Sequence, residues 1–125
     1  MKYCVHFLIK DDAYVLLHRA KNNPFYPNVW TPVIGKVKPN EEHIEAIKRE
    51  TIEEVSLTID NPLFYKNISH NNDEYWIYYS YITQSDFKNI ELNHENDLFS
   101  LFKHHELPSN TWEFFKVLIS KISFI

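Results

Sequence analysis

The chain has 125 residues and a formal net charge of −4, and 44% of its residues are hydrophobic and 16% aromatic. This length favours one domain, residues 1–125, around a single core. The acidic charge and the lack of a long basic run argue against duplex nucleic acid as a partner. No apolar run reaches the length of a membrane span, and the first residues do not resemble a signal peptide. We therefore expect a cytoplasmic protein that does not bind membranes.

The cysteine and histidine residues do not suggest a metal site of their own. Cys4 is the only cysteine, which excludes an internal disulfide and a thiolate metal centre, and we expect it to be a small core residue. The seven histidines lack the paired spacing of metal ligands.

The first third of the chain predicts a hairpin followed by a loop. Residues 5–9 and 13–17 are β-rich runs separated by the turn residues 10–12. Residues 22–28 hold two prolines and three asparagines, which indicates irregular structure, and short extended pieces are expected around Pro32.

A helix is predicted next, with Asn40 as its N-cap and with acidic residues in its first turn. Apolar positions recur at helical spacing and predict the side that faces the core. These positions are Ile44, Ile47, Thr51 and Val55.

The second half predicts further strands and a second helix. Residues 57–59 are expected to begin a strand, and residues 63–68 and 75–83 are expected to pair through a turn at 71–73. Residues 85–96 are polar and are expected to be irregular.

A short strand is predicted at 98–102, and residues 110–113 have the pattern of a capping box that begins the second helix. Strands, helix, strands and helix in this order predict an α+β fold, a mixed sheet flanked by helices.

A triplet of carboxylates carries the strongest chemical signal. Glu50, Glu53 and Glu54 stand at i, i+3 and i+4, so one side of a helix presents all three. Like charges this close repel each other, which favours a hard divalent cation among them, and such cations prefer oxygen ligands. The alternative is a solvated acidic face that forms surface pairs with Lys48 and Arg49.

The spacing of this region resembles the Nudix box, the loop–helix–loop motif of the Nudix (MutT-like) pyrophosphohydrolases. The box covers residues 35–57, and the matching positions are Gly35, Glu41, Arg49, Glu50, Glu53 and Glu54. Three positions depart from the family pattern: Ile34 replaces a common glycine, Thr51 a usual aliphatic residue, and Ser56 a second glycine. The resemblance implies the α/β/α sandwich of Nudix proteins.

The resemblance also implies a metal site and roles for its neighbours. Mg²⁺ or Mn²⁺ would be held by the carbonyl of Ile34 and by Glu50, Glu53 and Glu54. Arg49 would pair with Glu41, which lies two helical turns away, and orient Glu50 and Glu53. Either Glu53 or Glu95 would act as general base, and Glu91 and Asp97 are competitors for the part of Glu95.

Other residues are candidates for binding substrate. Arg19 resembles a phosphate-binding residue of the family, and Lys36 and Lys38 flank the glycine, where they can neutralise phosphate. Trp30 and Tyr78 are candidates to stack on a base, together with four further aromatic residues. These four are Phe25, Tyr26, Trp76 and Tyr79.

The function expected from the sequence is metal-dependent hydrolysis of a nucleoside diphosphate linked to another group, most simply a nucleoside triphosphate. The alternatives are an enzyme acting on RNA 5′ ends, dinucleotides or nucleotide sugars, a non-catalytic nucleotide sensor, and a structural domain. We expect a small-molecule nucleotide as partner and a monomer or a homodimer.

Overall fold

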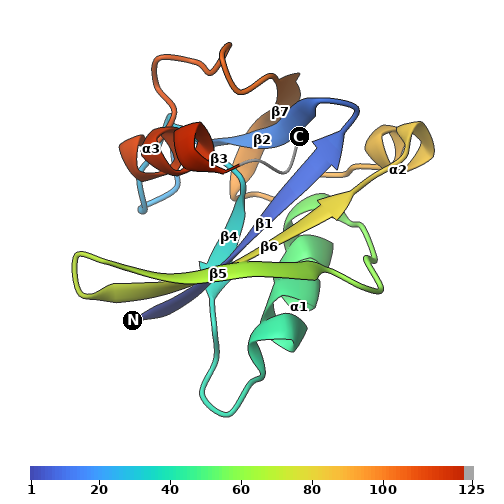
Figure 1. The fold of residues 1–125 in the computed structure, drawn as a ribbon. Coiled ribbons are helices and arrows are strands. Elements are labelled where there is room, and N and C mark those ends of the chain that lie inside the picture. Colours follow the sequence, from blue (N-terminus) through green and yellow to red (C-terminus); the bar gives the residue numbers. More distant parts are fainter. Residues whose placement is uncertain (123–125) are drawn as a thin grey trace.

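A computed structural model describes residues 1–122. Two helices and a short helical turn surround a seven-stranded mixed sheet (Figure 1). The elements in chain order are β1 (Lys2–Lys10), β2 (Ala13–Arg19), β3 (Trp30–Thr31), β4 (Val33–Lys36), α1 (His43–Val55), β5 (Leu63–His70), β6 (Asp73–Tyr81), α2 (Gln84–Lys88), β7 (Asn96–Phe102) and α3 (Glu113–Lys121).

β1 is the central strand of the sheet, whose main order is β3-β2-β1-β6-β5. It pairs in parallel with β6 from Lys2 opposite Glu74 to Ile9 opposite Tyr81, and it pairs antiparallel with β2 and β4. β7 adds to β2. Because β4 leads into α1, this pairing places the start of the box against the middle of the sheet.

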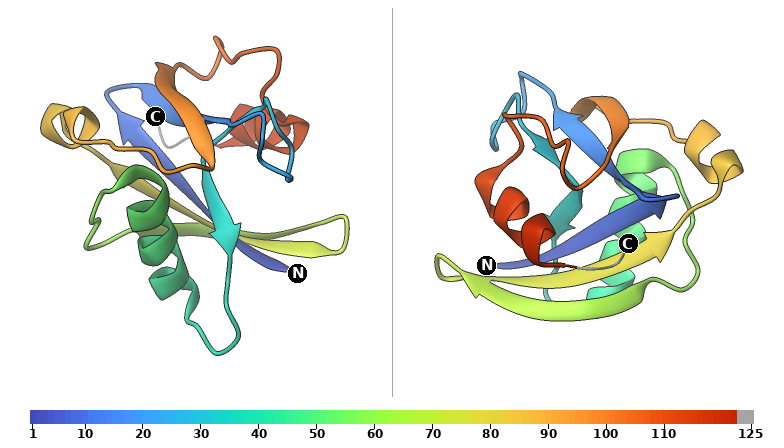
Figure 2. Two further views of the ribbon diagram at one scale, coloured as in Figure 1. Left: turned by 180° about the vertical axis from the view of Figure 1, so that it is seen from behind. Right: turned by 45° about the horizontal axis from the view of Figure 1, so that its top comes forward.

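The side chains of β1 alternate between the two faces of the sheet, as the period of a strand requires. Val5, Phe7 and Ile9 pack in one core cluster with α3, while Cys4 packs on the other side with Ala46 and Ile47 of α1. The two helices therefore cover opposite faces (Figure 2). The mixed sheet flanked by helices, predicted from the sequence, is confirmed.

Cys4 is fully buried, as expected, and burial raises the pKa of its thiol to about 12. His6 is fully buried beside it on the same face. Its ring nitrogens lie 2.7 Å from the hydroxyls of Thr51 and Ser80, and burial lowers its pKa to about 3. The hydroxyl of Thr51 donates to the carbonyl of Ile47, so Nδ1 of His6 donates to Thr51 and a polar contact joins α1 to the sheet.

The start of the first helix differs from the expectation. α1 begins at His43 with Glu42 as its N-cap, whereas Asn40 has φ 64° in a left-handed turn. An N-cap residue needs an extended backbone, so Asn40 cannot cap this helix.

The predicted capping box at residues 110–113 is wrong. α3 follows Trp112, whose side chain makes no cap hydrogen bond. The Asn110 amide donates instead to the carbonyl of Asn28, and the Thr111 hydroxyl donates to the carbonyl of Pro108.

Two further expectations are corrected in the segments around β5 and β6. Residues 57–59 form no strand, because the chain leaves α1 through a left-handed Ser56 and then buries Leu57 in the core. The polar segment 85–96 is not wholly irregular, since α2 extends into it as far as Lys88. Thr83 and Asp86 form its capping box, in which each side chain accepts a hydrogen bond from the other residue's backbone.

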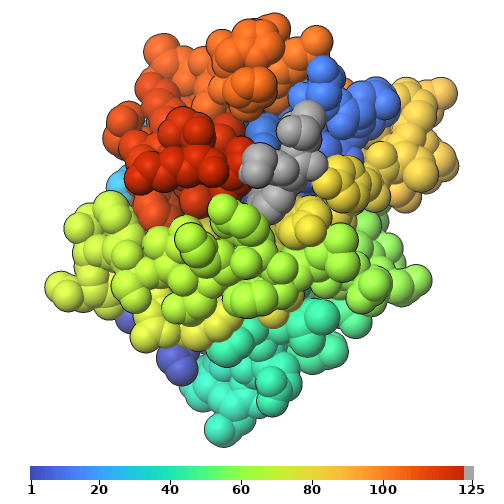
Figure 3. Space-filling model, in the orientation of Figure 1, coloured from blue at the N-terminus to red at the C-terminus, as the bar shows by residue number. Residues whose placement is uncertain are grey.

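β5 forms the outer edge of the sheet and remains uncovered over much of its length (Figure 3). Leu63 and Phe64 at its start are 41% and 54% exposed.

Candidate active site

The site begins where β4 and α1 meet. Gly35 lies in β4, and its Cα approaches the carboxylate of Glu50 so closely that an added Cβ would overlap all three carboxylate atoms. The backbone of Gly35 is extended in β4 and its φ is not positive, so no left-handed turn requires a glycine here. Glycine is required here because any larger residue would occupy the space of the Glu50 carboxylate.

Arg49 ties the loop before α1 to the helix. Its Nε and Nη2 donate to the two carboxylate oxygens of Glu41 at 2.9 and 3.0 Å, and Nη2 also donates to the carbonyl of Lys36. Nη1 donates to Glu50 at 2.8 Å and lies 3.4 Å from both oxygens of Glu53. The predicted contacts of Arg49 are confirmed, although Glu41 lies in the loop and not in the helix.

These contacts have an electrostatic consequence. The hydrogen bonds from Arg49 lower the pKa of Glu41 to about 2, and the same contacts raise the pKa of Arg49. The bidentate geometry is the strong form of an arginine–carboxylate pair.

Glu50 and Glu54 form a buried pair of carboxylates. They are 8% and 1% exposed, and burial raises the pKa of both. For Glu54 the nearby carboxylates of Glu50 and Glu95 raise the pKa further, while a hydrogen bond from Asn96 opposes this. The bond joins Nδ2 of Asn96 to Oε1 of Glu54 at 3.3 Å.

The residues present fit a hard divalent cation. Oε2 of Glu54 is buried and makes no hydrogen bond, and such an atom is costly unless something binds it. Two neighbouring carboxylates supply the oxygen donors that Mg²⁺ and Mn²⁺ prefer. Over residues 1–122, no three or more His, Cys, Asp or Glu side chains are already gathered as a metal site. The side chain of Glu53 is 48% exposed and lies against Arg49.

A cavity of about 750 Å³ opens beside this pair. Its polar wall contains Arg19, Lys36, Glu50 and Glu95. Five aromatic residues form much of the remainder, namely Tyr3, Phe25, Tyr26, Tyr75 and Trp112. A cavity with a charged wall and an aromatic wall suits a ligand that has a charged part and a ring.

Arg19 and Glu95 are held in place by the loop after β2. Arg19 is 8% exposed, and its Nε donates to the carbonyl of Phe25 at 2.7 Å. Burial lowers its pKa although Glu54 and Glu95 oppose this. The carbonyl of Glu95 accepts hydrogen bonds from the backbone of Ala20 and from the side chain of Asn23.

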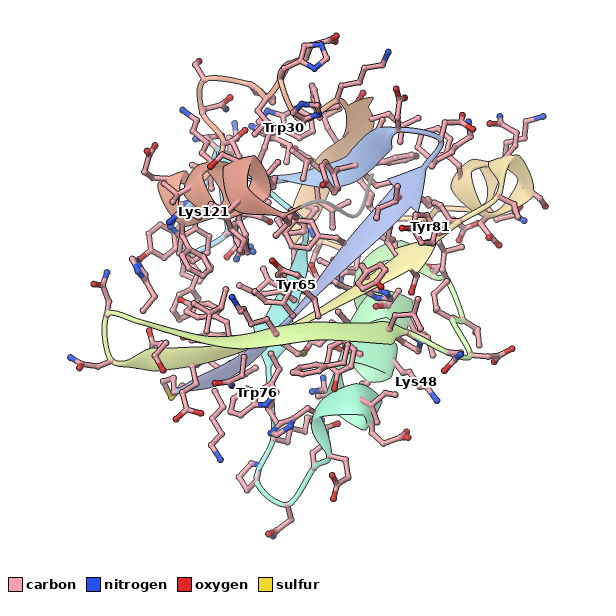
Figure 4. All side chains as sticks on the ribbon, in the orientation of Figure 1. Trp30, Lys48, Tyr65, Trp76, Tyr81 and Lys121 are labelled. Atoms are coloured by element: carbon pink, nitrogen blue, oxygen red, sulfur yellow. The ribbon has the colours of Figure 1, made fainter. Side chains whose placement is uncertain are left out.

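Three residues that were expected to bind the substrate do not line this cavity. Trp30 packs against His18 and Phe102, at the opposite end of the molecule from Trp76 (Figure 4). Tyr78 is 6% exposed and packs beneath α1. Lys38 borders a separate depression near the start of α1. Tyr78 points to the face covered by α1, so its position in the strand excludes it from the cavity.

Five residues that the sequence suggested for the site do line the cavity, namely Arg19, Phe25, Tyr26, Ile34 and Lys36. The carbonyl of Ile34 was the expected metal ligand. Sequence reasoning missed the aromatic residues that come from distant elements, Tyr3, Tyr75 and Trp112. It also missed Asn96, for which the adjacent Glu95 was the only signal.

Comparisons with known proteins identify the family and the fold of the chain. The family model of the NUDIX domain matches residues 3–120. No curated protein sequence matches the chain. Among residues 1–122, no helix has the length and apolar character needed to cross a membrane.

Solved structures share the fold at low sequence identity. A MutT NUDIX hydrolase from Burkholderia pseudomallei is 17% identical with a TM-score of 0.81, and the match covers 98% of this chain and 97% of that one. A MutT protein from Methanosarcina mazei Go1 is 17% identical with a TM-score of 0.74 over 97% and 91% of the two chains. A C. elegans Ap4A hydrolase is 19% identical with a TM-score of 0.71 over 95% and 93%.

Proposed function

The chain belongs to the NUDIX domain family and is a hydrolase of phosphoric anhydrides, and from this premise we propose that its substrate is a nucleoside diphosphate linked to another group. The simplest such substrate is a nucleoside triphosphate, with a nucleoside monophosphate and pyrophosphate as products. The observation that carries the proposal is the buried pair Glu50 and Glu54 beside a cavity that also contains Arg19 and Lys36. A cytoplasmic location is part of the same proposal.

The acidic residues have assigned parts in this proposal. Glu50, Glu53, Glu54 and the carbonyl of Ile34 would hold Mg²⁺ or Mn²⁺, which supplies charge neutralisation for the polyphosphate and activation of water. Arg49 keeps Glu50 and Glu53 oriented through its hydrogen bonds.

The proton of the attacking water goes to Glu53 or Glu95. The position of Glu95 in the cavity wall supports Glu95, whereas Glu53 lies against Arg49. In this assignment Glu95→Gln lowers kcat at saturating Mg²⁺ more than Glu53→Gln does. The reverse order would assign the proton to Glu53.

The remainder of the substrate would occupy the two walls of the cavity. Arg19 and Lys36 would neutralise phosphate oxygens that the cation does not reach. The base would stack on aromatic rings, for which Tyr26 and Trp112 offer a stacked pair with ring centroids 4.1 Å apart. In this proposal the base stacks on Tyr26 and Trp112, and not on Trp30 and Tyr78 as the sequence suggested.

A substrate panel tests the proposal. Nucleoside triphosphates, a dinucleotide, a nucleotide sugar and triphosphorylated RNA are incubated with the protein and Mg²⁺ or Mn²⁺, and release of pyrophosphate is compared with release of phosphate. We expect pyrophosphate from a nucleoside triphosphate, and a decrease in turnover on the order of 10³ in Glu54→Gln.

Glu45→Gln is the matched control, because Glu45 is an exposed glutamate of the same helix, and its turnover should remain that of the wild type. Nucleotide binding without turnover would favour the non-catalytic sensor. Turnover of another member of the panel alone would replace the substrate that we propose.

A further inference from the structure

Asn96 has an unusual position next to the carboxylate pair. Over residues 1–122, three buried side-chain atoms lack a hydrogen-bond partner, and they are Thr31 Oγ1, Glu54 Oε2 and Asn96 Oδ1. Two of the three belong to side chains that are bonded to each other, since Nδ2 of Asn96 donates to Oε1 of Glu54. Asn96 is 3% exposed, so bulk water does not satisfy its free oxygen.

The fold fixes the backbone of Asn96 from both sides. Asn96 is the first residue of β7 and pairs with Arg19 at a bulge between His18 and Arg19. The carbonyl of the preceding residue, Glu95, accepts hydrogen bonds at 3.0 and 3.1 Å. The amide is therefore carried by a rigid strand end, and it reaches across to α1 without a flexible segment.

One arrangement of the two side chains explains why Oε2 of Glu54 and Oδ1 of Asn96 both lack a hydrogen-bond partner. The amide of Asn96 occupies one oxygen of Glu54 and leaves the other, Oε2, as the one that can bind a cation. Oδ1 of Asn96 is an acceptor only, so its missing partner is a donor. A water molecule bound to a divalent cation is such a donor, and it would lie close to Oε2 because the two side chains are in contact.

We propose that Asn96 is a positioning residue for the divalent cation: its Nδ2 holds Oε1 of Glu54, and its Oδ1 accepts a hydrogen bond from a water molecule bound to the cation. This role rests on the proposed function and lies outside the box, residues 35–57. Asn96 acts through Glu54 and water, so it is not itself a catalytic residue. Partners of this kind commonly change metal affinity by roughly 10- to 100-fold when they are removed.

Binding of Mn²⁺ alone provides the first test. Free Mn²⁺ is followed by electron paramagnetic resonance as it is titrated into the wild type, Asn96→Ala and Thr111→Val, without nucleotide. We expect the dissociation constant to rise roughly 10-fold or more in Asn96→Ala. Thr111 is the control because it is 4% exposed and its hydroxyl makes a hydrogen bond to Pro108, away from the carboxylates. Its removal should lower stability and leave Mn²⁺ affinity unchanged.

Dependence of turnover on Mg²⁺ provides the second test. In Asn96→Ala the Mg²⁺ concentration for half-maximal activity should rise by the same factor as the Mn²⁺ dissociation constant. At saturating Mg²⁺ its kcat should return to within about threefold of the wild type. A purely structural role would lower the melting temperature and leave both metal constants unchanged, which would overturn the inference.

The outcomes separate this inference from the function on which it rests. A wild type that does not bind Mn²⁺ would contradict the metal site itself. A wild type that binds Mn²⁺ while Asn96→Ala binds it equally well would contradict only the role of Asn96. If Asn96→Ala does not fold, Asn96→Leu replaces it, since leucine fills nearly the same space and also lacks both polar atoms.

Discussion

At the scale of single residues, the buried carboxylate of Glu54 opposes folding while it serves the site. It is 1% exposed, and burial and the nearby Glu50 raise its pKa. A folded-state pKa above the unfolded value means that the folded protein loses stability as the pH rises beyond the ordinary glutamate range. Glutamine at this position keeps the shape and removes the charge.

We therefore expect Glu54→Gln to stabilise the metal-free protein by about 1 kcal/mol near pH 8 and to abolish most activity. Urea unfolding in the presence of a chelator measures the free energy of unfolding for the variant and the wild type. Toward pH 4 the difference should shrink, because Glu54 of the wild type is then protonated. Equal stability at both pH values would show that Glu54 carries no unfavourable charge.

A second prediction at this scale concerns Tyr26. Tyr26 is 54% exposed and its ring stacks on Trp112 at the cavity, so its loss would remove a contact with the base without damage to the core. We expect Tyr26→Ala to raise KM roughly 5- to 10-fold with kcat nearly unchanged. Phe64→Ala is the control, since Phe64 is equally exposed on β5, and a similar rise in KM there would remove the case for stacking.

At the scale of elements, the ion pair of Glu41 and Arg49 holds the loop that precedes α1. Arg49 lowers the pKa of Glu41 to about 2. The resulting stability is complete above the unfolded pKa of about 4.5 and disappears as the pH falls through 2. The side chain of Glu41 is 16% exposed, so part of the interaction is screened by solvent.

We expect Glu41→Gln to lower the free energy of unfolding by about 1–2 kcal/mol near pH 7 and by nearly nothing near pH 2. Urea unfolding over a series of pH values gives the difference from the wild type. Glu45→Gln, on the exposed side of the same helix, should show a smaller loss that varies little with pH. A constant difference for Glu41→Gln over the whole range would contradict the shifted pKa.

Local sequence rules predicted the elements well where a pattern acts within one segment. The hairpin of β1 and β2 follows from a local pattern, and the contact of Arg49 with Glu41 was expected from the resemblance to the box. The structure confirms both. These rules failed where a contact with a distant segment determines the local structure. Asn110 has the pattern of a helix cap, yet its amide bonds to Asn28, on the loop after β2.

The residues that line the cavity were likewise predicted only where a local pattern pointed to them. Tyr3 and Tyr75 come from a central strand and its parallel neighbour, and Trp112 comes from the segment before α3. Only the tertiary fold brings the three residues together. Tyr78 was favoured for its aromatic ring, but alternation along β6 turns it to the opposite face from Tyr75. No local pattern contains this information.

At the scale of the whole molecule, the cation should act as a stabilising ligand of the folded state. The proposed ligands Glu50 and Glu54 are buried together by folding, so the unfolded chain has no comparable site. We expect Mn²⁺ at about 100 times its dissociation constant to add about 2.7 kcal/mol to the free energy of unfolding and to raise the melting temperature by several degrees. Differential scanning calorimetry with and without a chelator measures the shift. The shift should vanish in Glu54→Gln, and its persistence there would place the cation elsewhere.

The use of glycine makes the tolerance of this chain to mutation uneven. Among residues 1–122, the left-handed backbone positions are occupied by other residue types, namely Asp11, Tyr26, Asn28, Asn40, Ser56, Asn71 and Asn72. Turns of this kind accept glycine readily, whereas most other side chains are strained at a positive φ. Gly35 has no such latitude, since even alanine would collide with Glu50. A mutational scan of this protein would thus find that alanine at Gly35 displaces the carboxylate of Glu50, whereas glycine is accepted at the left-handed loop positions.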